Sequence, residues 1–270
     1  MDRSKKLELL NIAKEAALKA GEVHLKYYGK KKEIIHKLNE FDLVTNADKE
    51  SEEIIIETIK KVFYNHDILA EESQKDQSRS DFRWVIDPLD GTTNYAHNFP
   101  QFCVSIGLIY KGEIYLGVVF DAVKKELFHA VKGLGAFLND EPIQVSSIKK
   151  VSQSLLATGF PYDRKNPEAN NLNYFEAFTY RAQAIRRPGA AALDMCYLAC
   201  GRFDGFWELK LAPWDTAAGT IIVREAGGIV TNFFSNDFNI FTQNIIASNP
   251  FIYDEMTQIL KDTNPEIPVI

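Results

Sequence analysis

The sequence predicts an α/β protein of the mixed α+β type, and three observations support this prediction. Apolar residues recur at helical spacing near the N-terminus, and they alternate in a hairpin pattern over residues 102–119. Beyond about residue 148, expected strands and helices follow one another in turn. We expect one domain with two lobes: helices on a mainly antiparallel sheet in about residues 1–147, and an α/β lobe in about residues 148–270.

The N-terminal part begins with an amphipathic helix over residues 7–28, which Gly29 ends. The basic run Lys30–Lys31–Lys32 reads as a solvated loop, and beside an anionic substrate it would steer phosphate. A second helix runs to Phe63, with Thr45 and Asp48 spaced as a capping pair. A short buried strand over residues 68–70 then leads into two adjacent acids, and residues 74–81 read as a surface loop.

The sheet continues with strands over residues 82–86, 102–110, 114–119, 126–131 and 136–138, with a hairpin turn at Lys111–Gly112. In the second lobe we expect strands near residues 154–157, 184–186, 203–208, 229–231 and 244–247. Helices are expected over residues 167–182, 190–199 and 213–226, and from residue 251.

Composition excludes several classes of protein. Hydrophobic residues make up 46% of the 270 residues, charged residues 25%, and the net charge is −6, which argues against nucleic acid or an acidic membrane as the main partner. Apolar runs are too short to span a bilayer, and the charged N-terminus leads into an amphipathic pattern, so we expect a cytoplasmic protein without membrane partners. Three cysteines do not indicate a disulfide framework, and core packing is favoured over zinc binding for Cys196 and Cys200.

Residues 84–94, which read Trp-Val-Ile-Asp-Pro-Leu-Asp-Gly-Thr-Thr-Asn, are the most informative stretch. A buried strand delivers Asp87 and Asp90 into a turn that Pro88 stiffens, and Gly91 lets the backbone approach a ligand. Thr92 and Thr93 are candidate caps of a following helix, whose free N–H groups would suit a phosphate. The alternative is that both acids are ordinary turn residues.

Four acids, Glu71, Asp87, Asp90 and Asp215, have no lysine in their own motifs. Asp215 begins an expected helix, where capping is the simpler role. If the four carboxylates lie together, they repel one another unless cations neutralise them. Hard oxygen donors without His or Cys favour Mg²⁺, with Mn²⁺ as the alternative and Zn²⁺ disfavoured.

The motif is similar to the signature of the inositol monophosphatase family of Mg²⁺-dependent, lithium-sensitive phosphatases. The resemblance extends over nearly the whole chain, through Asp48, Glu71–Glu72–Ser73, Gly189–Ala190–Ala191 and Trp214–Asp215 with Ala217–Ala218–Gly219. It implies a layered αβαβα sandwich of the kind shared with fructose-1,6-bisphosphatase, a homodimer, and a small phosphorylated polyol as substrate. Ala70 and Ala190 depart from the family pattern, and Ala190 offers no hydroxyl to a sugar.

The resemblance also implies roles for single residues. Glu71, Asp87 and the carbonyl of Leu89 hold one Mg²⁺ that polarises the attacking water. Asp87, Asp90 and Asp215 hold a second that stabilises the leaving oxygen, and a third, weaker ion uses Glu71. Thr92, supported by Asp48, orients the attacking water. The amides of Gly91 and Thr92 hold the phosphate. The substrate hydroxyls are contacted by Asp90, Ala191 and Glu208. Residue chemistry alone does not choose Glu71 over Glu72, and Glu208 also reads as an exposed charge at a strand end.

We therefore expect a Mg²⁺-dependent phosphomonoesterase that hydrolyses myo-inositol monophosphate. The alternatives are fructose-1,6-bisphosphatase activity or a broader sugar-phosphate or nucleotide phosphatase, including one that acts on phosphoadenosine phosphate. A non-enzymatic alternative is a protein-binding regulator on the same fold.

Overall fold

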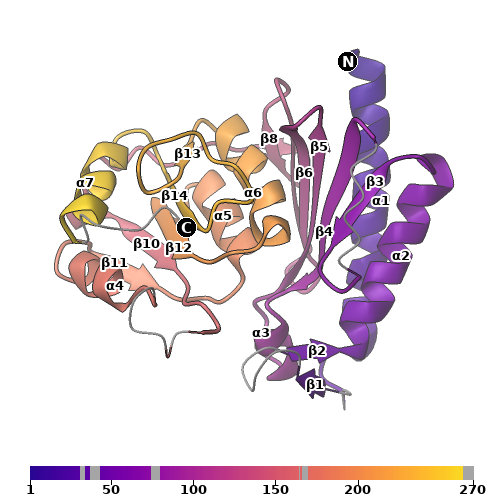
Figure 1. Ribbon diagram of the computed structural model, residues 1–270, viewed down its shortest axis with the longest axis horizontal. Helices are drawn as coiled ribbons and strands as arrows, with labels where there is room; N and C mark the ends of the chain where they lie inside the picture. The colour runs from indigo at the N-terminus through magenta and orange to yellow at the C-terminus, as the bar shows by residue number, and fades with distance from the viewer. Residues whose placement is uncertain (31–33, 37–42, 74–79, 164, 166–169, 264–270) are drawn as a thin grey trace.

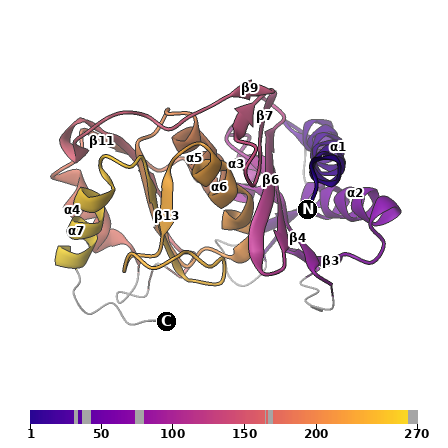
Figure 2. The same cartoon turned by 90° about the horizontal axis from the view of Figure 1, so that it is seen from above.

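The structure forms five layers of helices and sheets (Figures 1 and 2). This computed structural model describes residues 1–30, 34–36, 43–73, 80–163, 165 and 170–263. Helices α1 and α2 cover the outer face of a seven-stranded sheet, α5 and α6 fill the middle layer, and a five-stranded sheet follows, with α4 and α7 on its far face. The expected αβαβα sandwich is confirmed. Lys31, Lys32 and residues 74–79 of the expected loops lie outside the described residues.

The helices are α1 (Arg3–Tyr27), α2 (Asn46–Val62), α3 (Thr92–Ala96), α4 (Leu172–Thr179), α5 (Ala191–Ala199), α6 (Pro213–Glu225) and α7 (Tyr253–Thr263), with one 3₁₀ turn, η1 (Val151–Gln153). The seven-stranded sheet contains β3 (Asp67–Ala70), β4 (Phe82–Asp90), β5 (Cys103–Tyr110), β6 (Glu113–Asp121), β7 (Glu126–Val131), β8 (Ala136–Leu138) and β9 (Glu141–Pro142). The five-stranded sheet contains β10 (Leu155–Thr158), β11 (Ala184–Arg186), β12 (Gly205–Leu209), β13 (Ile229–Thr231) and β14 (Asn244–Ser248). A separate pair is formed by β1 (Ile34–His36) and β2 (Leu43–Thr45).

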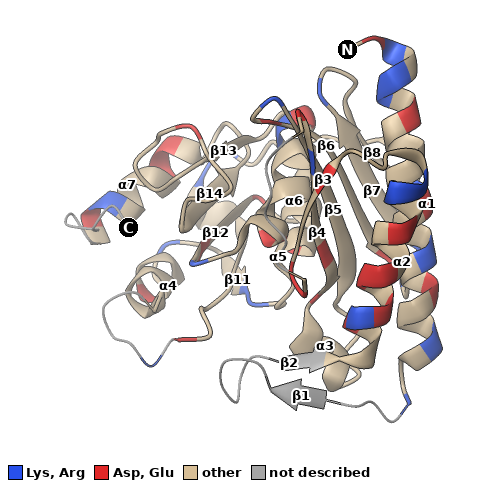
Figure 3. Cartoon of the chain, turned by 45° about the vertical axis from the view of Figure 1, so that its right-hand side comes forward, with Lys and Arg blue, Asp and Glu red and all other residues tan. Residues whose placement is uncertain are grey.

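The two N-terminal helices begin as the sequence predicts. The Asp2 carboxylate accepts the Lys5 N–H at 2.9 Å and caps α1. At the start of α2, the Thr45 and Asp48 side chains form the expected capping box. Both helices pack apolar faces on the seven-stranded sheet, whereas acidic and basic residues mix along their exposed faces (Figure 3).

Strand β4 continues further than the sequence indicates. It pairs in parallel with β3 and antiparallel with β5, and it runs through the two motif acids to Asp90. The pairing with β5 shifts between Asp87 and Asp90, and Pro88 fits there because a residue at a bulge need not donate to the ladder.

The helix after the motif begins differently from our expectation. Gly91, with a φ of 91°, is the N-cap of α3, and no side chain caps this helix. The prediction that Thr92 or Thr93 is the cap was therefore wrong. A left-handed cap residue suits glycine, and an added Cβ would lie 2.8 Å from the Gln101 carbonyl oxygen.

The second sheet has the strand order β11-β10-β12-β14-β13. Its β10 pairs in parallel with β11 and β12, whereas β14 runs antiparallel to both of its neighbours. The expected alternation of strands and helices is confirmed. Among the described residues of the helix expected over 167–182, α4 leaves out 170–171 and 180–182, and residues 167–169 lie outside the described residues.

Helix α6 lies very close to the seven-stranded sheet (Figure 1). A Cβ added to Gly107 would lie 2.7 Å from the Ala217 Cβ, and one added to Gly117 would lie 2.5 Å from the Ala218 carbonyl oxygen. The two glycines therefore let helix backbone and sheet backbone come together. One hydrophobic cluster joins residues of both sheets to α5 and α6.

Two sequence expectations concern membranes and cysteines. Within the described ranges, no helix is long and apolar enough to cross a membrane. Cys103, Cys196 and Cys200 are all free thiols. Cys196 is buried in the core and Cys200 is partly buried against it, as the packing interpretation predicts, and Cys103 is buried in the same cluster.

Candidate active site

Two acids lie side by side where β3 and β4 run parallel. Ala70 is in register with Ile86, and the Glu71 N–H donates to the Ile86 carbonyl at 3.1 Å. The next residue of each strand is thus an acid, Glu71 beside Asp87. Asp87 is 2% exposed, and its carboxylate accepts the Leu89 N–H at 2.9 Å.

Asp90 joins the first half of the chain to the second. Its Oδ2 atom accepts the Ala192 N–H, in the first turn of α5, at 2.8 Å, and the Cys103 thiol donates to the same oxygen at 3.7 Å. Asp90 is 8% exposed. Because its partners belong to β5 and α5, Asp90 is held between the seven-stranded sheet and the middle layer of helices.

Asp215 lies in the first turn of α6 and caps it. Its Oδ2 atom accepts the Ala212 N–H at 2.7 Å, so the capping interpretation is correct, although Asp215 is the third helical residue and not the N-cap. The Ser105 hydroxyl donates to the Trp214 carbonyl at 3.2 Å, and Ser105 is in register with Asp87. The start of α6 is therefore tied to the sheet opposite Asp87.

Electrostatic interactions connect four acids, which we name the carboxylate cluster: Glu71, Asp87, Asp90 and Asp215. Burial raises the pKa of Asp87 well above its ordinary value, and the charges of Glu71, Asp90 and Asp215 raise it further. Burial, with Asp90 and Glu71, does the same to the pKa of Asp215. Burial raises the pKa of Asp90 to about 6 against the opposing Ala192 hydrogen bond. Glu71, and not Glu72, is the neighbouring acid that acts on these three residues.

The cluster has the chemistry of a magnesium site. Its donors are all oxygen, and the neighbouring charges that raise the pKa of Asp87 are those of Glu71, Asp90 and Asp215, all carboxylates whose repulsion a bound cation would relieve. In the part of the chain that the structure describes, no three Asp, Glu, His or Cys side chains stand close enough to hold an ion as they are.

Thr92 and Asp48 form a buried hydrogen-bonded pair beside the cluster. The Thr92 hydroxyl lies 3.2 Å from Asp48 Oδ1 and 3.0 Å from the Leu89 carbonyl, so its single proton is directed at these two acceptors. Asp48 Oδ2 accepts both the N–H and the hydroxyl of Thr45, at 2.8 and 2.6 Å. Burial raises the pKa of Asp48 to about 7, against the Thr45 hydrogen bonds. The Thr92 oxygen keeps its lone pairs for a further donor.

Glu208 is buried, so the interpretation as an exposed charge was wrong. It is 8% exposed on β12, and its carboxylate lies so close to Gly159 that a Cβ there would lie 2.0 Å from Oε1. Burial raises the pKa of Glu208 to about 8, although the charge of Arg187 opposes the change. Ala191, the first residue of α5, is 8% exposed on the Asp90 side.

Sequence reasoning missed two buried acids near the cluster. Glu52 on α2 accepts the Glu72 N–H at 2.8 Å, which holds the turn after β3. Asp194 on α5 is 1% exposed, and its pKa is raised well above the ordinary value by burial, with Glu208 and Asp90 adding to the effect. The spacing from Asp48 to Glu52 on one helix face was an available signal, whereas nothing local in the sequence marks Asp194.

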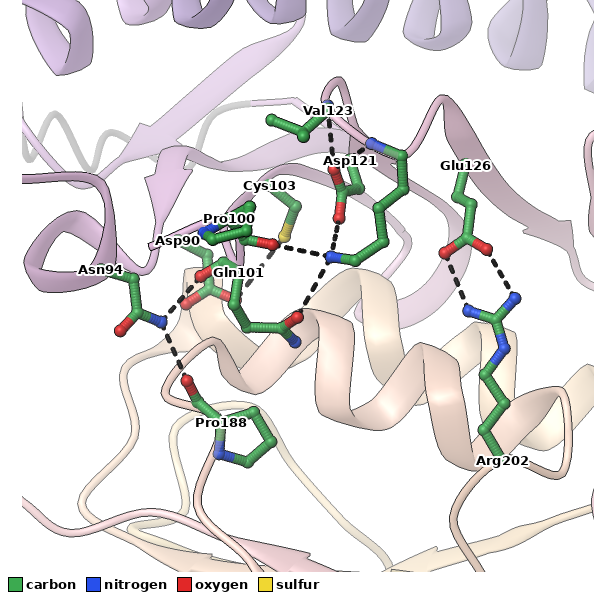
Figure 4. A network of polar contacts seen from close by, with 11 residues as sticks. Asp90, Asn94, Pro100, Gln101, Cys103, Asp121, Val123, Glu126, Pro188 and Arg202 are labelled. Carbon is green, nitrogen blue, oxygen red and sulfur yellow. Dashed lines mark hydrogen bonds and ion pairs between the residues drawn. The ribbon is translucent and has the colours of Figure 1, made fainter. Parts of the chain in front are cut away.

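Asn94, the last residue of the motif, clamps two segments together (Figure 4). Its amide nitrogen lies 2.7 Å from the Gln101 carbonyl, 2.9 Å from the Pro188 carbonyl and 3.2 Å from the Gly189 carbonyl. These bonds hold α3 against the loop that leads into α5, which is the helix that donates to Asp90.

Comparison with known proteins places the chain among phosphatases. The profile described as "Inositol monophosphatase family" matches residues 5–265. An "Inositol-1-monophosphatase" from Synechocystis sp. is 48% identical over 94% of this chain and 89% of its own length. A "Nus factor SuhB" from Escherichia coli is 42% identical over 94% and 96% of the two chains. The structure of an inositol monophosphatase from Anabaena superposes with a TM-score of 0.87 at 44% identity, covering 98% of each chain.

Proposed function

Because this chain belongs to the inositol monophosphatase family, we propose that it is a Mg²⁺-dependent phosphomonoesterase that converts myo-inositol monophosphate to inositol and phosphate. The observation that carries the proposal is the carboxylate cluster, whose four acids come from both halves of the chain, and in which burial and the charges of neighbouring acids raise the pKa of Asp87 and Asp215. A phosphate ester bound at the carboxylate cluster would contact the metal-binding oxygens, one hydroxyl group and backbone amides.

Glu71, Asp87, Asp90, Asp215 and the Leu89 carbonyl would hold two Mg²⁺ ions, and Glu71 would contribute to a third, weaker site. Bound Mg²⁺ supplies Lewis-acid stabilisation of phosphoryl oxygens and makes bound water more acidic. The chain's part is to hold these oxygens near one another, with Asp87 and Asp90 buried.

Thr92 and Asp48 would prepare the attacking water. Since the Thr92 proton points at Asp48 or the Leu89 carbonyl, the hydroxyl oxygen accepts a hydrogen bond from a water and fixes its direction. Asp48 is fully buried, so it acts through Thr92 as a positioning residue. The backbone amides of Gly91 and Thr92 would hold the phosphate.

The alcohol part of the substrate would be bound by Glu208, Ala191 and Asp90. Glu208 brings a carboxyl group to a largely enclosed place, where its oxygens exchange hydrogen bonds with sugar hydroxyls. Asp90 would serve both the metal and a substrate hydroxyl. Ala191 contributes main chain at the start of α5.

Phosphate release from three esters tests this proposal. The esters are myo-inositol 1-phosphate, fructose 1,6-bisphosphate and phosphoadenosine phosphate, each with Mg²⁺, with Mg²⁺ plus Li⁺, or with EDTA. We expect inositol phosphate to be cleaved fastest, only with Mg²⁺, and less in the presence of Li⁺. Fastest cleavage of another ester would move the assignment to a sugar-phosphate or nucleotide phosphatase.

Asp90→Asn and Asp215→Asn test the cluster itself. Each removes a charge without removing packing, and because loss of a residue supporting a ligand already costs about 10- to 100-fold, we expect losses of about 100-fold or more. Asp81→Asn is the matched control, since Asp81 is exposed and, among the described residues, its carboxylate pairs with Lys111 at 3.8 Å. Full activity of either cluster variant would contradict its role, and circular dichroism would check that the fold is intact.

A second candidate is a protein-binding regulator on the same fold. The relatives named "Nus factor SuhB" favour it, because they match over nearly the whole chain. If the purified protein cleaves none of the three esters, affinity capture of partners decides between an unknown substrate and this role. The family resemblance is also the ground for proposing a homodimer, and a light-scattering mass of 30.6 kDa would contradict it.

A further inference from the structure

The bulge in β4 brings Asp87 and Asp90 to the same face of the seven-stranded sheet. Asp87 is in register with Ser105 of β5 and Asp90 with Cys103, so three steps along β4 correspond to two steps along β5. Side chains alternate between the two faces of a strand, and residues three apart share a face only where a bulge adds one residue. Ser105 and Cys103 are two apart, so they share a face as well. Each acid of the motif therefore has one short side chain of β5 opposite it.

The two side chains of β5 donate to different partners. The Ser105 hydroxyl donates to the Trp214 carbonyl at 3.2 Å, which ties the sheet to the start of α6. The Cys103 thiol donates to Asp90 Oδ2 at 3.7 Å (Figure 4). A thiol is a weak donor, so the effect of this bond depends on what else holds the same oxygen.

Asp90 Oδ2 has a second, stronger donor on its other side. The Ala192 N–H, in the first turn of α5, donates to it at 2.8 Å. The two donors come from different elements, a strand of the sheet and a helix of the middle layer, and both hydrogen bonds fall on Oδ2. Together they fix the rotation of the carboxylate, and Oδ1 is the oxygen that these donors leave for a cation.

The surroundings of Cys103 keep its thiol in the donor form. Cys103 is 0% exposed and lies in the hydrophobic cluster that joins the sheet to α5 and α6. A thiol in apolar surroundings keeps its proton, and a buried thiol is also a good packing residue. Packing alone is therefore a second explanation of Cys103, and substitutions at this position separate the two.

We propose that Cys103 is a positioning residue of the metal site, whose thiol, with the Ala192 N–H, fixes the Asp90 carboxylate for the Mg²⁺ ion that Asp87, Asp90 and Asp215 would hold. This role rests on the proposed function, in which Asp90 is a metal ligand. Hydrogen-bonding partners of a ligand orient it and raise the affinity of a metal site. In this role Cys103 acts through Asp90 and is not itself a ligand.

Three substitutions at position 103 distinguish hydrogen bonding from packing. Cys103→Ser keeps a donor, whereas Cys103→Ala and Cys103→Val remove it, and valine still fills the space. Cys196→Ala is the matched control, because Cys196 is also 0% exposed in the same cluster. Within the described ranges, the Cys196 thiol makes no hydrogen bond to Asp90.

Binding of Mn²⁺ in the absence of substrate, followed by the electron paramagnetic resonance of the free ion, measures the metal site directly. We expect Cys103→Ala and Cys103→Val to weaken the ion that Asp90 helps to hold by about tenfold, the lower end of the usual loss, because a thiol is a weak donor. Cys103→Ser and Cys196→Ala should stay within about threefold of the unmutated protein. The ion held by Glu71, Asp87 and the Leu89 carbonyl should change by no more than about twofold in any variant, since Asp90 does not hold it.

Equal Mn²⁺ affinity in the unmutated protein, Cys103→Ala and Cys103→Val would overturn the role of Cys103 and leave the phosphatase proposal standing. A loss as large in Cys103→Ser or in Cys196→Ala would also overturn it, because packing would then explain the change. If the affinities change as expected but the unmutated protein hydrolyses no ester, the phosphatase proposal fails and the role of Cys103 stands. Absence of Mn²⁺ binding to the unmutated protein would overturn both.

Discussion

His24 shows how a single residue beneath the motif makes stability depend on pH. It is fully buried on α1, and its Nε2–H donates to the Pro88 carbonyl at 2.8 Å. Burial lowers the pKa of His24 to about 4, against the Pro88 hydrogen bond, whereas an unfolded histidine titrates near its ordinary value of about 6.5. At pH values between these two pKa values, His24 is protonated in the unfolded chain and neutral in the folded chain.

The His24 contribution to stability is therefore complete above about pH 6.5 and declines as the pH falls towards 4, by up to about 3 kcal/mol. We expect His24→Gln, which keeps a donor for Pro88 but does not titrate, to lose this part of the pH dependence. Urea unfolding of both proteins at pH 4.5 and pH 7 measures it. Buried acids respond to pH in both proteins, so the difference isolates His24, and equal changes would contradict the assignment.

Residue-level inference from sequence reached its limit at contacts between distant segments. Asp87, Asp90 and Asp215 stand out because Pro, Gly and Trp surround them in recognisable motifs. Asp194 carries no such local mark, since it looks like one polar residue in an apolar helix. Its burial beside Glu208 depends on how α5 packs against β12, which short-range patterns do not encode.

At the scale of elements, Asn94 ties α3 to the loop before α5. Asn94→Asp replaces its N–H donors with a carboxylate that faces three carbonyl oxygens. We expect the unfolding free energy to fall by about 2–4 kcal/mol, because several hydrogen bonds are lost and like partial charges meet. We also expect kcat to drop about tenfold, because the Ala192 donor to Asp90 shifts.

The control for this change is Asn98→Asp, four residues further on. Its side-chain oxygen accepts the Gly29 N–H at 3.2 Å, and aspartate keeps that acceptor. Denaturant melts and phosphate-release kinetics on both variants provide the comparison. If Asn98→Asp lowered the unfolding free energy and kcat as much as Asn94→Asp, the added charge alone would explain both losses. The hydrogen bonds of Asn94 to the carbonyl groups would then not be needed as an explanation.

Element boundaries were predictable where the apolar period was strong. The positions of β7, β8 and β11 match the expected ranges, because alternation or a short apolar run is bounded there by Gly or charged residues. The motif was harder, since Pro88 suggests a turn, whereas the observed strand absorbs it in a bulge.

At the scale of the whole molecule, the carboxylate cluster links the two halves of the chain. Asp87 and Asp90 belong to β4 of the seven-stranded sheet, Glu71 directly follows β3, and Asp215 comes from α6. A divalent cation that relieves their repulsion binds the folded chain only. At 100 times its dissociation constant it adds about 2.7 kcal/mol, which for a chain of this size raises Tm by about 5–10 °C.

Thermal melts with Mg²⁺ or with EDTA at matched ionic strength check this expectation. Asp215→Asn should lose most of the increase, because it removes the donor from the second half. An increase of the same size in the variant would show that Mg²⁺ stabilises the protein elsewhere.

The layered architecture follows from the amphipathic helices and the alternating strands. The order of the strands within each sheet does not follow from these patterns. The order β11-β10-β12-β14-β13 places a parallel group beside an antiparallel pair, and this choice is made by packing on α4 to α7.

The glycines beneath α6 set a dimension of the active site. At Gly107 and Gly117 the helix rests on bare main chain, so the gap between α6 and the sheet is one backbone thickness and not an adjustable layer of side chains. Asp215 is carried by that helix and Asp87 by that sheet. The distance between these two acids is therefore set by contact of main chain with main chain, so changes in side-chain packing elsewhere in the hydrophobic core leave it unaltered.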